Sequence, residues 1–179
     1  MNQKPIDIVV IPDATHPQRG QLHCGGHVFA CVLGRNGVSP SKREGDGATP
    51  TGKFPLLRVF YREDRVATPL TALPTTPIAQ DDGWCDAPED PDYNHLVKMP
   101  YAASAENMWR DDALYDVVAV IGHNDHPVID GAGSAIFLHV APPDGEPTAG
   151  CVALDFVNLL SVLRLMTPSS VIDIHEPQR

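Results

Sequence analysis

The sequence predicts a mainly β fold, formed as one domain over residues 1–179. Three observations support this prediction. The apolar runs are short and rich in β-branched residues, which is typical of strands. The chain contains 18 Pro and 14 Gly, so turns are expected to be frequent. A strong helical pattern occurs at one place, residues 155–166, near the end of the chain.

Strands are expected at five places along the chain. A hairpin is expected to turn at Gly25-Gly26, because two glycines between apolar arms are typical of tight turns. The stretch DVVAVIG is apolar almost throughout and is expected to form a buried strand. The expected strands are residues 7–11, the two arms of 21–33, 53–62, 116–122 and 171–174.

Two segments are predicted to be helical. Asp155 is a good N-cap for the helix at 155–166, whose leucines fall on one face. A shorter helix is predicted at 103–112, where Ser104 can act as the cap and Glu106 lies in the first turn.

Composition limits the classes of function. Lys and Arg number 13 against 23 Asp and Glu, a net charge of −10, and no basic patch is visible, so a nucleic-acid partner is not expected. The apolar run near the N-terminus is interrupted by Asp7 and does not resemble a signal peptide, and no stretch is long enough to span a membrane. A cytoplasmic location is expected, or a periplasmic or cell-envelope location if a leader has been removed.

The stretch with the clearest chemical character runs from Ser134 to Leu154. An apolar run carries His139 to its end, a loop rich in Pro and Gly follows, and Gly150 then precedes Cys151. A thiol near an imidazole can act as a nucleophile, and the backbone N–H groups around Gly150 and Cys151 can hold an oxyanion. The positive end of the helix that follows can also stabilise a thiolate. The alternative is an inert buried thiol.

Two motifs resemble one known family. The segment TAGCVAL at 148–154, with His139 upstream, resembles the [ST]-H-G-C-[IV]-R-[LM] signature of the YkuD-type L,D-transpeptidase catalytic domain. The segment EGDGATPTGKF at 44–54 is similar to that family's G-D-x-x-T-P-x-G-x-F stretch. The resemblance implies a β-sandwich or open barrel with mixed strand pairing, and one helix after the nucleophile.

The resemblance also implies an activity. Cys151 would attack the meso-diaminopimelate carbonyl of a peptidoglycan tetrapeptide stem, form a thioester and release D-Ala, with His139 as the base. The expected partner is therefore a stem peptide or a muropeptide. No cofactor and no metal are expected, and the oligomeric state is left open.

The two motifs depart from the family pattern at two positions. The signature histidine before the nucleophile is Ala149, and the signature arginine after it is Ala153. We hypothesise that His123 takes the role of the missing histidine by sharing one rim with His139. Arg110 is the candidate replacement for the arginine that would bind the substrate carboxylate.

The long region from residue 63 to 100 is expected to be an irregular insertion that covers the cleft. Trp84 and Tyr93 are its candidate cleft walls, and Asn94 is a further candidate substrate contact. The alternative is that these side chains pin the loop to the core.

The acceptor of the acyl group decides between two activities. Water gives an L,D-carboxypeptidase, and an amine of a second stem gives an L,D-transpeptidase that forms 3→3 cross-links. Water is favoured if the N-terminus is native, because recycled muropeptides are the substrates within reach in the cytoplasm. A rival class is a non-catalytic module, or a zinc-binding protein that uses His123, His126, His139 and Cys151.

Overall fold

The structure, a computed structural model, describes residues 6–177. In chain order its elements are β1 (Ile8–Pro12), β2 (Arg19–Cys24), β3 (His27–Val32), β4 (Val38–Ser39), β5 (Thr49–Pro50), β6 (Gly52–Tyr61), β7 (Thr75–Pro77), β8 (Asp82–Cys85), β9 (Leu96–Lys98), β10 (Ala105–Asn107), β11 (Val117–Ile121), β12 (Phe137–Val140), β13 (Val152–Leu154), α1 (Phe156–Leu163) and β14 (Val171–Ile174).

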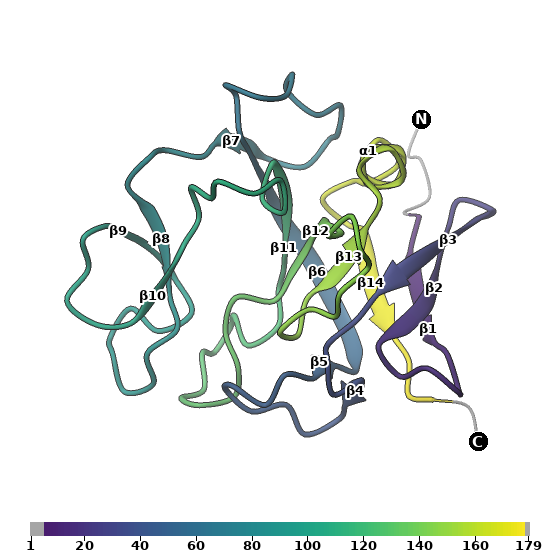
Figure 1. The fold of residues 1–179 in the computed structure, drawn as a ribbon, viewed down its shortest axis with the longest axis horizontal. Coiled ribbons are helices and arrows are strands. Elements are labelled where there is room, and N and C mark those ends of the chain that lie inside the picture. Colours follow the sequence, from purple (N-terminus) through teal and green to yellow (C-terminus); the bar gives the residue numbers. More distant parts are fainter. Residues whose placement is uncertain (1–5, 178–179) are drawn as a thin grey trace.

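The main sheet closes on itself. It has nine strands in the order β11-β12-β13-β3-β2-β1-β14-β6-β7, and an additional pairing joins β11 to β6 (Figure 1). This pairing closes the sheet into a barrel and leaves β7 outside it. Three pairs are parallel, β12–β13, β1–β14 and β6–β7, while the others in this sheet are antiparallel. The predicted mainly β class with mixed pairing is therefore confirmed.

The expected strands and the hairpin are present. The hairpin of β2 and β3 turns at Gly25 and Gly26, both with positive φ, so glycine is the residue that fits this turn. The alternating burial of β1 follows its sequence, because Ile8 and Val10 point into the barrel. The prediction of these strands succeeded because the alternation of apolar and polar residues in the sequence matches the alternation of buried and exposed side chains in the structure.

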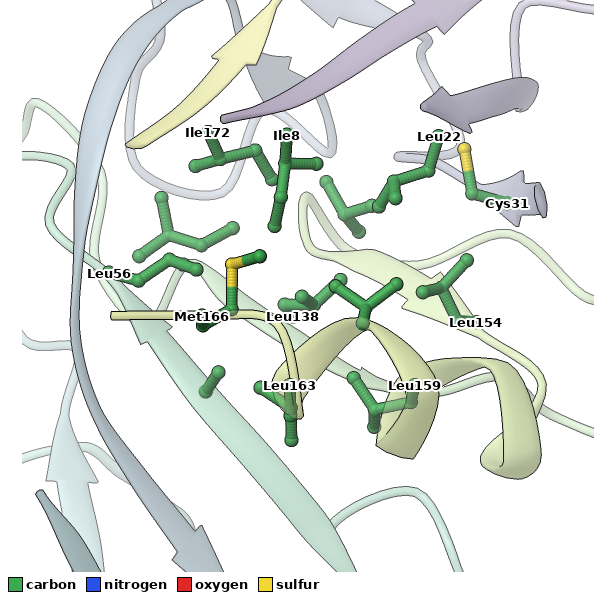
Figure 2. Close-up of a cluster of buried hydrophobic side chains, with 14 of the residues drawn as sticks. Ile8, Leu22, Cys31, Leu56, Leu138, Leu154, Leu159, Leu163, Met166 and Ile172 are labelled. Carbon is green, nitrogen blue, oxygen red and sulfur yellow. The ribbon is translucent and has the colours of Figure 1, made fainter. Parts of the chain in front are cut away.

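The barrel interior holds the main hydrophobic core. Leu159 and Leu163 of α1 lie in this core with Leu138 of β12 and Leu154 of β13 (Figure 2). Each fully buried Leu contributes roughly 1.5–3 kcal/mol relative to an exposed one. The side chain of Asp155 accepts a hydrogen bond from the N–H of residue 157, so the predicted N-cap is confirmed, although the helix ends at residue 163 rather than 166.

A second core lies on the outer face of β11 and β12. There Val118, Val120 and Phe137 pack against Trp84 of the insertion and against Met108, which follows it. The insertion is more ordered than expected, since its strands β8 and β9 pair with each other. β8 also pairs with β10, which follows the insertion, and the three strands form a small sheet beside the barrel (Figure 1). This packing places the insertion next to the strands that carry the candidate nucleophile and base.

The helix predicted at 103–112 is wrong. Residues 105–107 form β10, which pairs antiparallel with residues 83–85 of β8. Turns follow, in which the guanidinium of Arg110 bonds to the carboxylate of Asp112. Tertiary pairing has overridden a weak local helical signal. Within residues 6–177, no helix has the length and apolar character needed to cross a membrane.

Candidate active site

Strand register brings Cys151 and His139 to one cleft. In the parallel β12–β13 pair, His139 lies beside Ala153, so Cys151 lies opposite Phe137. Residues two apart on a strand share a face, which places the side chains of Cys151, Phe137 and His139 on the outer side of the barrel. Cys151 and His139 both line a cleft of about 460 Å³. Both side chains are nearly buried, with 7% and 4% of their residue surface exposed.

The imidazole of His139 is oriented as a base. Its Nδ1 lies 2.8 Å from the carbonyl oxygen of Val140, and a carbonyl only accepts, so Nδ1 carries the hydrogen. Nε2 is then unprotonated and can accept a proton. Burial lowers the pKa of His139 to about 4, so the ring is neutral at pH 7. The ring of Tyr115 packs edge-on against the imidazole at 5.4 Å between centroids and fixes its plane.

The thiol of Cys151 is held by backbone groups. Sγ lies 3.3 Å from the carbonyl oxygen of Ala135, to which it donates, and it accepts from the N–H of Phe137 at 3.4 Å. Burial raises the pKa of the Cys151 thiol to about 12. The resting site is therefore a neutral thiol in the same cleft as a neutral imidazole, and attack on a substrate requires the thiol hydrogen to leave the carbonyl oxygen of Ala135.

The turn before Cys151 is braced by two threonines. The N–H of Gly150 donates to Thr148 Oγ1 at 3.1 Å, and Thr148 Oγ1 in turn donates to the carbonyl oxygen of Cys151 at 2.7 Å. Thr49, from the second motif, reaches the same carbonyl at 3.3 Å. The N–H of Gly150 is thus already used, which corrects the expectation that it holds the oxyanion. The N–H of Cys151 has no hydrogen-bond partner within residues 6–177 and is available.

The cleft walls carry charges of both signs. Arg110 lines the cleft, but its Nε and Nη2 atoms bond to Asp112 at 2.9 and 2.6 Å. Burial raises the pKa of Glu106, which lies 3.7 Å from Nη1 of Arg110. Among the described residues, Asp86 Oδ1 is the buried side-chain oxygen without a partner. The charged lining residues are Arg35, Lys42, Glu44, Asp86, Glu106, Arg110 and Glu146.

Comparison with protein families identifies the domain. The model described as the L,D-transpeptidase catalytic domain, YkuD, matches residues 15–174. The chain belongs to this family. A comparison with curated proteins gave no match.

Several solved structures are similar to this L,D-transpeptidase domain. Pgp2, a helical cell shape determining protein from Campylobacter jejuni, is 16% identical with a TM-score of 0.44, over 98% of this chain and 50% of that one. L,D-transpeptidase 1 from Mycobacterium tuberculosis is 12% identical with a TM-score of 0.40, over 94% of this chain and 62% of that one. An L,D-transpeptidase from Mycobacterium smegmatis is 14% identical with a TM-score of 0.41, over 96% and 59%. The chain thus spans between half and two thirds of the length of these proteins.

His123 lies outside the cleft of this L,D-transpeptidase domain. Strands β11 and β12 are antiparallel with Val118 beside His139, so His123, which follows β11, lies next to the segment that precedes β12. Its Nε2 donates to the carbonyl oxygen of Ala132 at 2.9 Å. The expectation that the two imidazoles share one rim is therefore wrong, because it required both strands to end on the same side.

Trp84, Tyr93 and Asn94 do not line the cleft, and the expectation of cleft walls is corrected. The Trp84 indole N–H donates to Asn94 Oδ1 at 2.9 Å, and this oxygen also accepts from the N–H of Ala135 at 3.0 Å. The Tyr93 hydroxyl donates to the carboxylate of Glu44. These side chains fix the backbone that contacts the Cys151 thiol, which agrees with the alternative that they pin the insertion to the core.

The helix after the nucleophile does not reach the thiol. Strand β13 separates Cys151 from α1, and α1 packs into the barrel core, on the other side of the sheet from the sulfur. A helix dipole acts within about one turn of the helix end. The expectation that it stabilises the thiolate is therefore wrong.

Other cleft residues were missed from the sequence. Lys42 and Glu44 lie in a loop of charged and small residues just before and inside the second motif, and their position in the motif was the available signal. The sequence around Glu106 and Tyr115 gives no signal of a cleft position, because these residues reach the cleft through the fold of the segment that follows the insertion. Within residues 6–177 there is no group of three or more His, Cys, Asp or Glu side chains placed to hold a metal ion.

The raised pKa of Cys151 predicts a pH profile for alkylation. The fraction of thiolate grows tenfold per pH unit below the pKa. The rate of modification by iodoacetamide is therefore expected to rise about tenfold per unit from pH 6.5 to 9.5, measured by mass spectrometry of the intact protein. The Cys151→Ala variant supplies the background of the other three thiols. A plateau below pH 8 would show that the resting site is an ion pair.

Proposed function

We propose that this chain is a cysteine acyl-transferase that acts on peptidoglycan stem peptides, at the bond between meso-diaminopimelate and the terminal D-Ala. One observation carries the proposal: the thiol of Cys151 shares a cleft with His139, whose Nε2 is free to take a proton. Membership of the L,D-transpeptidase family supports the choice of reaction.

The first step forms a thioester. Nε2 of His139 takes the proton of Cys151 as Sγ attacks the carbonyl carbon of the scissile bond, and the carbonyl oxygen becomes an oxyanion. The N–H of Cys151 donates to that oxyanion. The intermediate then collapses, the C–N bond breaks, and the imidazolium gives its proton to the nitrogen of the departing D-Ala.

The second step transfers the acyl group. His139 takes a proton from the acceptor as the acceptor attacks the thioester carbon. The C–S bond then breaks, and the proton returns to the sulfur of Cys151. Because the pair starts and ends neutral, the cycle needs no permanent thiolate, which agrees with the raised pKa of the thiol.

The mixed charges of the cleft support the choice of substrate. The free end of a diaminopimelate side chain carries an ammonium and a carboxylate. Asp86 and Glu106 offer carboxylate oxygens to the ammonium, while the Nη1 edge of Arg110 faces the cleft as a cation for the carboxylate. A purely apolar peptide would leave Asp86 Oδ1, which has no partner among the described residues, without one, and this costs free energy.

The test is an incubation with disaccharide tetrapeptide, followed by mass spectrometry. We expect loss of D-Ala and a covalent adduct on the protein during turnover. A free tripeptide product identifies water as the acceptor and an L,D-carboxypeptidase, whereas a cross-linked dimer identifies an L,D-transpeptidase. The absence of product and adduct would favour the non-catalytic module instead.

A further inference from the structure

Lys42 is a nearly buried cation in the wall of the cleft. Its side chain is 5% exposed and runs past two glycines. A Cβ added to Gly133 would lie 2.9 Å from Lys42 Cγ, and a Cβ added to Gly150 would lie 3.6 Å from Lys42 Nζ. Both glycines have positive φ, at 102° and 146°. The backbone on each side therefore leaves room for the lysine to reach the residue before Cys151.

The ammonium of Lys42 has one donor to spare. An ammonium carries three protons. One goes to the carboxylate of Asp46 and another to the carbonyl oxygen of Arg43, at 2.9 Å. Asp46 is itself held by the N–H groups of Arg43 and Ala48, at 2.8 and 2.9 Å. The third proton has no partner within residues 6–177, and the side chain lines the cleft. This spare proton faces the cleft wall, where a ligand can supply the acceptor.

The nucleophile itself offers the oxyanion one donor, the N–H of Cys151. Acyl-transfer sites usually offer more than one, and the N–H of Gly150 is already bonded to Thr148. Among the described residues, the turn then keeps the N–H groups of Ala149 and Cys151 without a partner, and only the second belongs to the nucleophile. The Lys42 ammonium beside Gly150, the residue before Cys151, can supply a further and charged contact.

The position of Lys42 also fits the orientation that the substrate must take in the cleft. His139 lies beside Ala153, which follows Cys151 on its strand, whereas the Lys42 ammonium lies by Gly150, which precedes it. Imidazole and ammonium thus lie on opposite sides of the sulfur along the strand. The imidazole must face the departing nitrogen, so the carbonyl oxygen of the substrate falls on the lysine side.

We propose that the Lys42 ammonium is the second oxyanion donor, acting together with the N–H of Cys151 in both acyl-transfer steps. When Sγ bonds to the carbonyl carbon, the electron pair of the C=O π bond moves to oxygen, and the spare N–H of Lys42 donates to it. No proton leaves the lysine, and the contact is released when the C=O bond re-forms. Asp46 keeps the ammonium in place. This inference rests on the proposed function.

The test compares Lys42→Met with Asp46→Asn on disaccharide tetrapeptide. The contact forms only when charge develops on oxygen, so Lys42→Met is expected to lower kcat about 10²- to 10³-fold and to change KM less than threefold. Asp46→Asn removes the ion pair but leaves the cation, and it is expected to keep at least a tenth of kcat. A merely structural role of the ion pair predicts equal losses in both variants.

A double variant separates a loss of stability from a loss of catalysis. If Lys42→Met lowers the thermal midpoint strongly because Asp46 is left unpaired, Lys42→Met combined with Asp46→Asn removes both charges together. That pair of changes is expected to restore the midpoint and to keep the low kcat. A kcat within threefold of wild type, or a raised KM with unchanged kcat, would overturn the inference while leaving Cys151 as the nucleophile. An inactive wild-type protein would instead overturn the proposed function.

Discussion

Replacing Cys151 with Ala is expected to lower turnover of disaccharide tetrapeptide by about 10⁴-fold or more. Loss of a nucleophile removes the covalent path entirely, and removal of such a residue has effects of this size in other covalent enzymes. The covalent adduct seen by mass spectrometry is expected to disappear as well. Turnover and adduct are measured together, because the adduct identifies the residue and turnover measures its importance.

Cys24→Ala is the matched control for this change. Cys24 is also buried, at 2% exposure, but it lies in the barrel core, away from the cleft. Its removal is expected to lower the thermal midpoint slightly and to leave kcat within twofold. If Cys151→Ala kept more than a hundredth of the wild-type turnover, the nucleophile would have to be another group.

Replacing His139 with Gln is expected to lower kcat/KM by about 10²- to 10⁴-fold, the range for loss of a general base. The side-chain amide of Gln can still donate to the carbonyl oxygen of Val140, but it cannot take the proton of Cys151. Because the pKa of His139 is lowered to about 4, the wild-type base is already deprotonated at pH 6. The wild-type kcat/KM is therefore expected to be flat from pH 6 to 9, measured in steady state.

His23→Gln is the control for the histidine change. His23 is on β2, away from the cleft, and its Nε2 lies 3.3 Å from Oε1 of Gln21. This variant is expected to keep the wild-type rate. A His139→Gln variant that retained more than a tenth of kcat/KM would contradict the assignment of the base.

The insertion and the segment that follows it show where local sequence pattern is a poor guide. Ser104 and Glu106 satisfy the rules for a helix start, yet this segment forms β10 because β8 offers an edge to pair with. Trp84 has the size expected of a cleft wall, but it packs edge-on against Phe137 at 5.1 Å in the second core. A large aromatic gains more free energy from full burial than from the rim of a groove.

The resemblance of one motif named Cys151 and His139 as candidate nucleophile and base. The sequence by itself determined most strands of the barrel and the N-cap at Asp155. Each of these depends on residues that are close along the chain, where alternation, capping and turn chemistry act directly. The tertiary structure decided which further groups reach the sulfur. The antiparallel β11–β12 pair removed His123 from the rim, and packing across two glycines brought Lys42 beside Gly150. Such contacts join segments far apart in sequence, so only strand register and packing fix them.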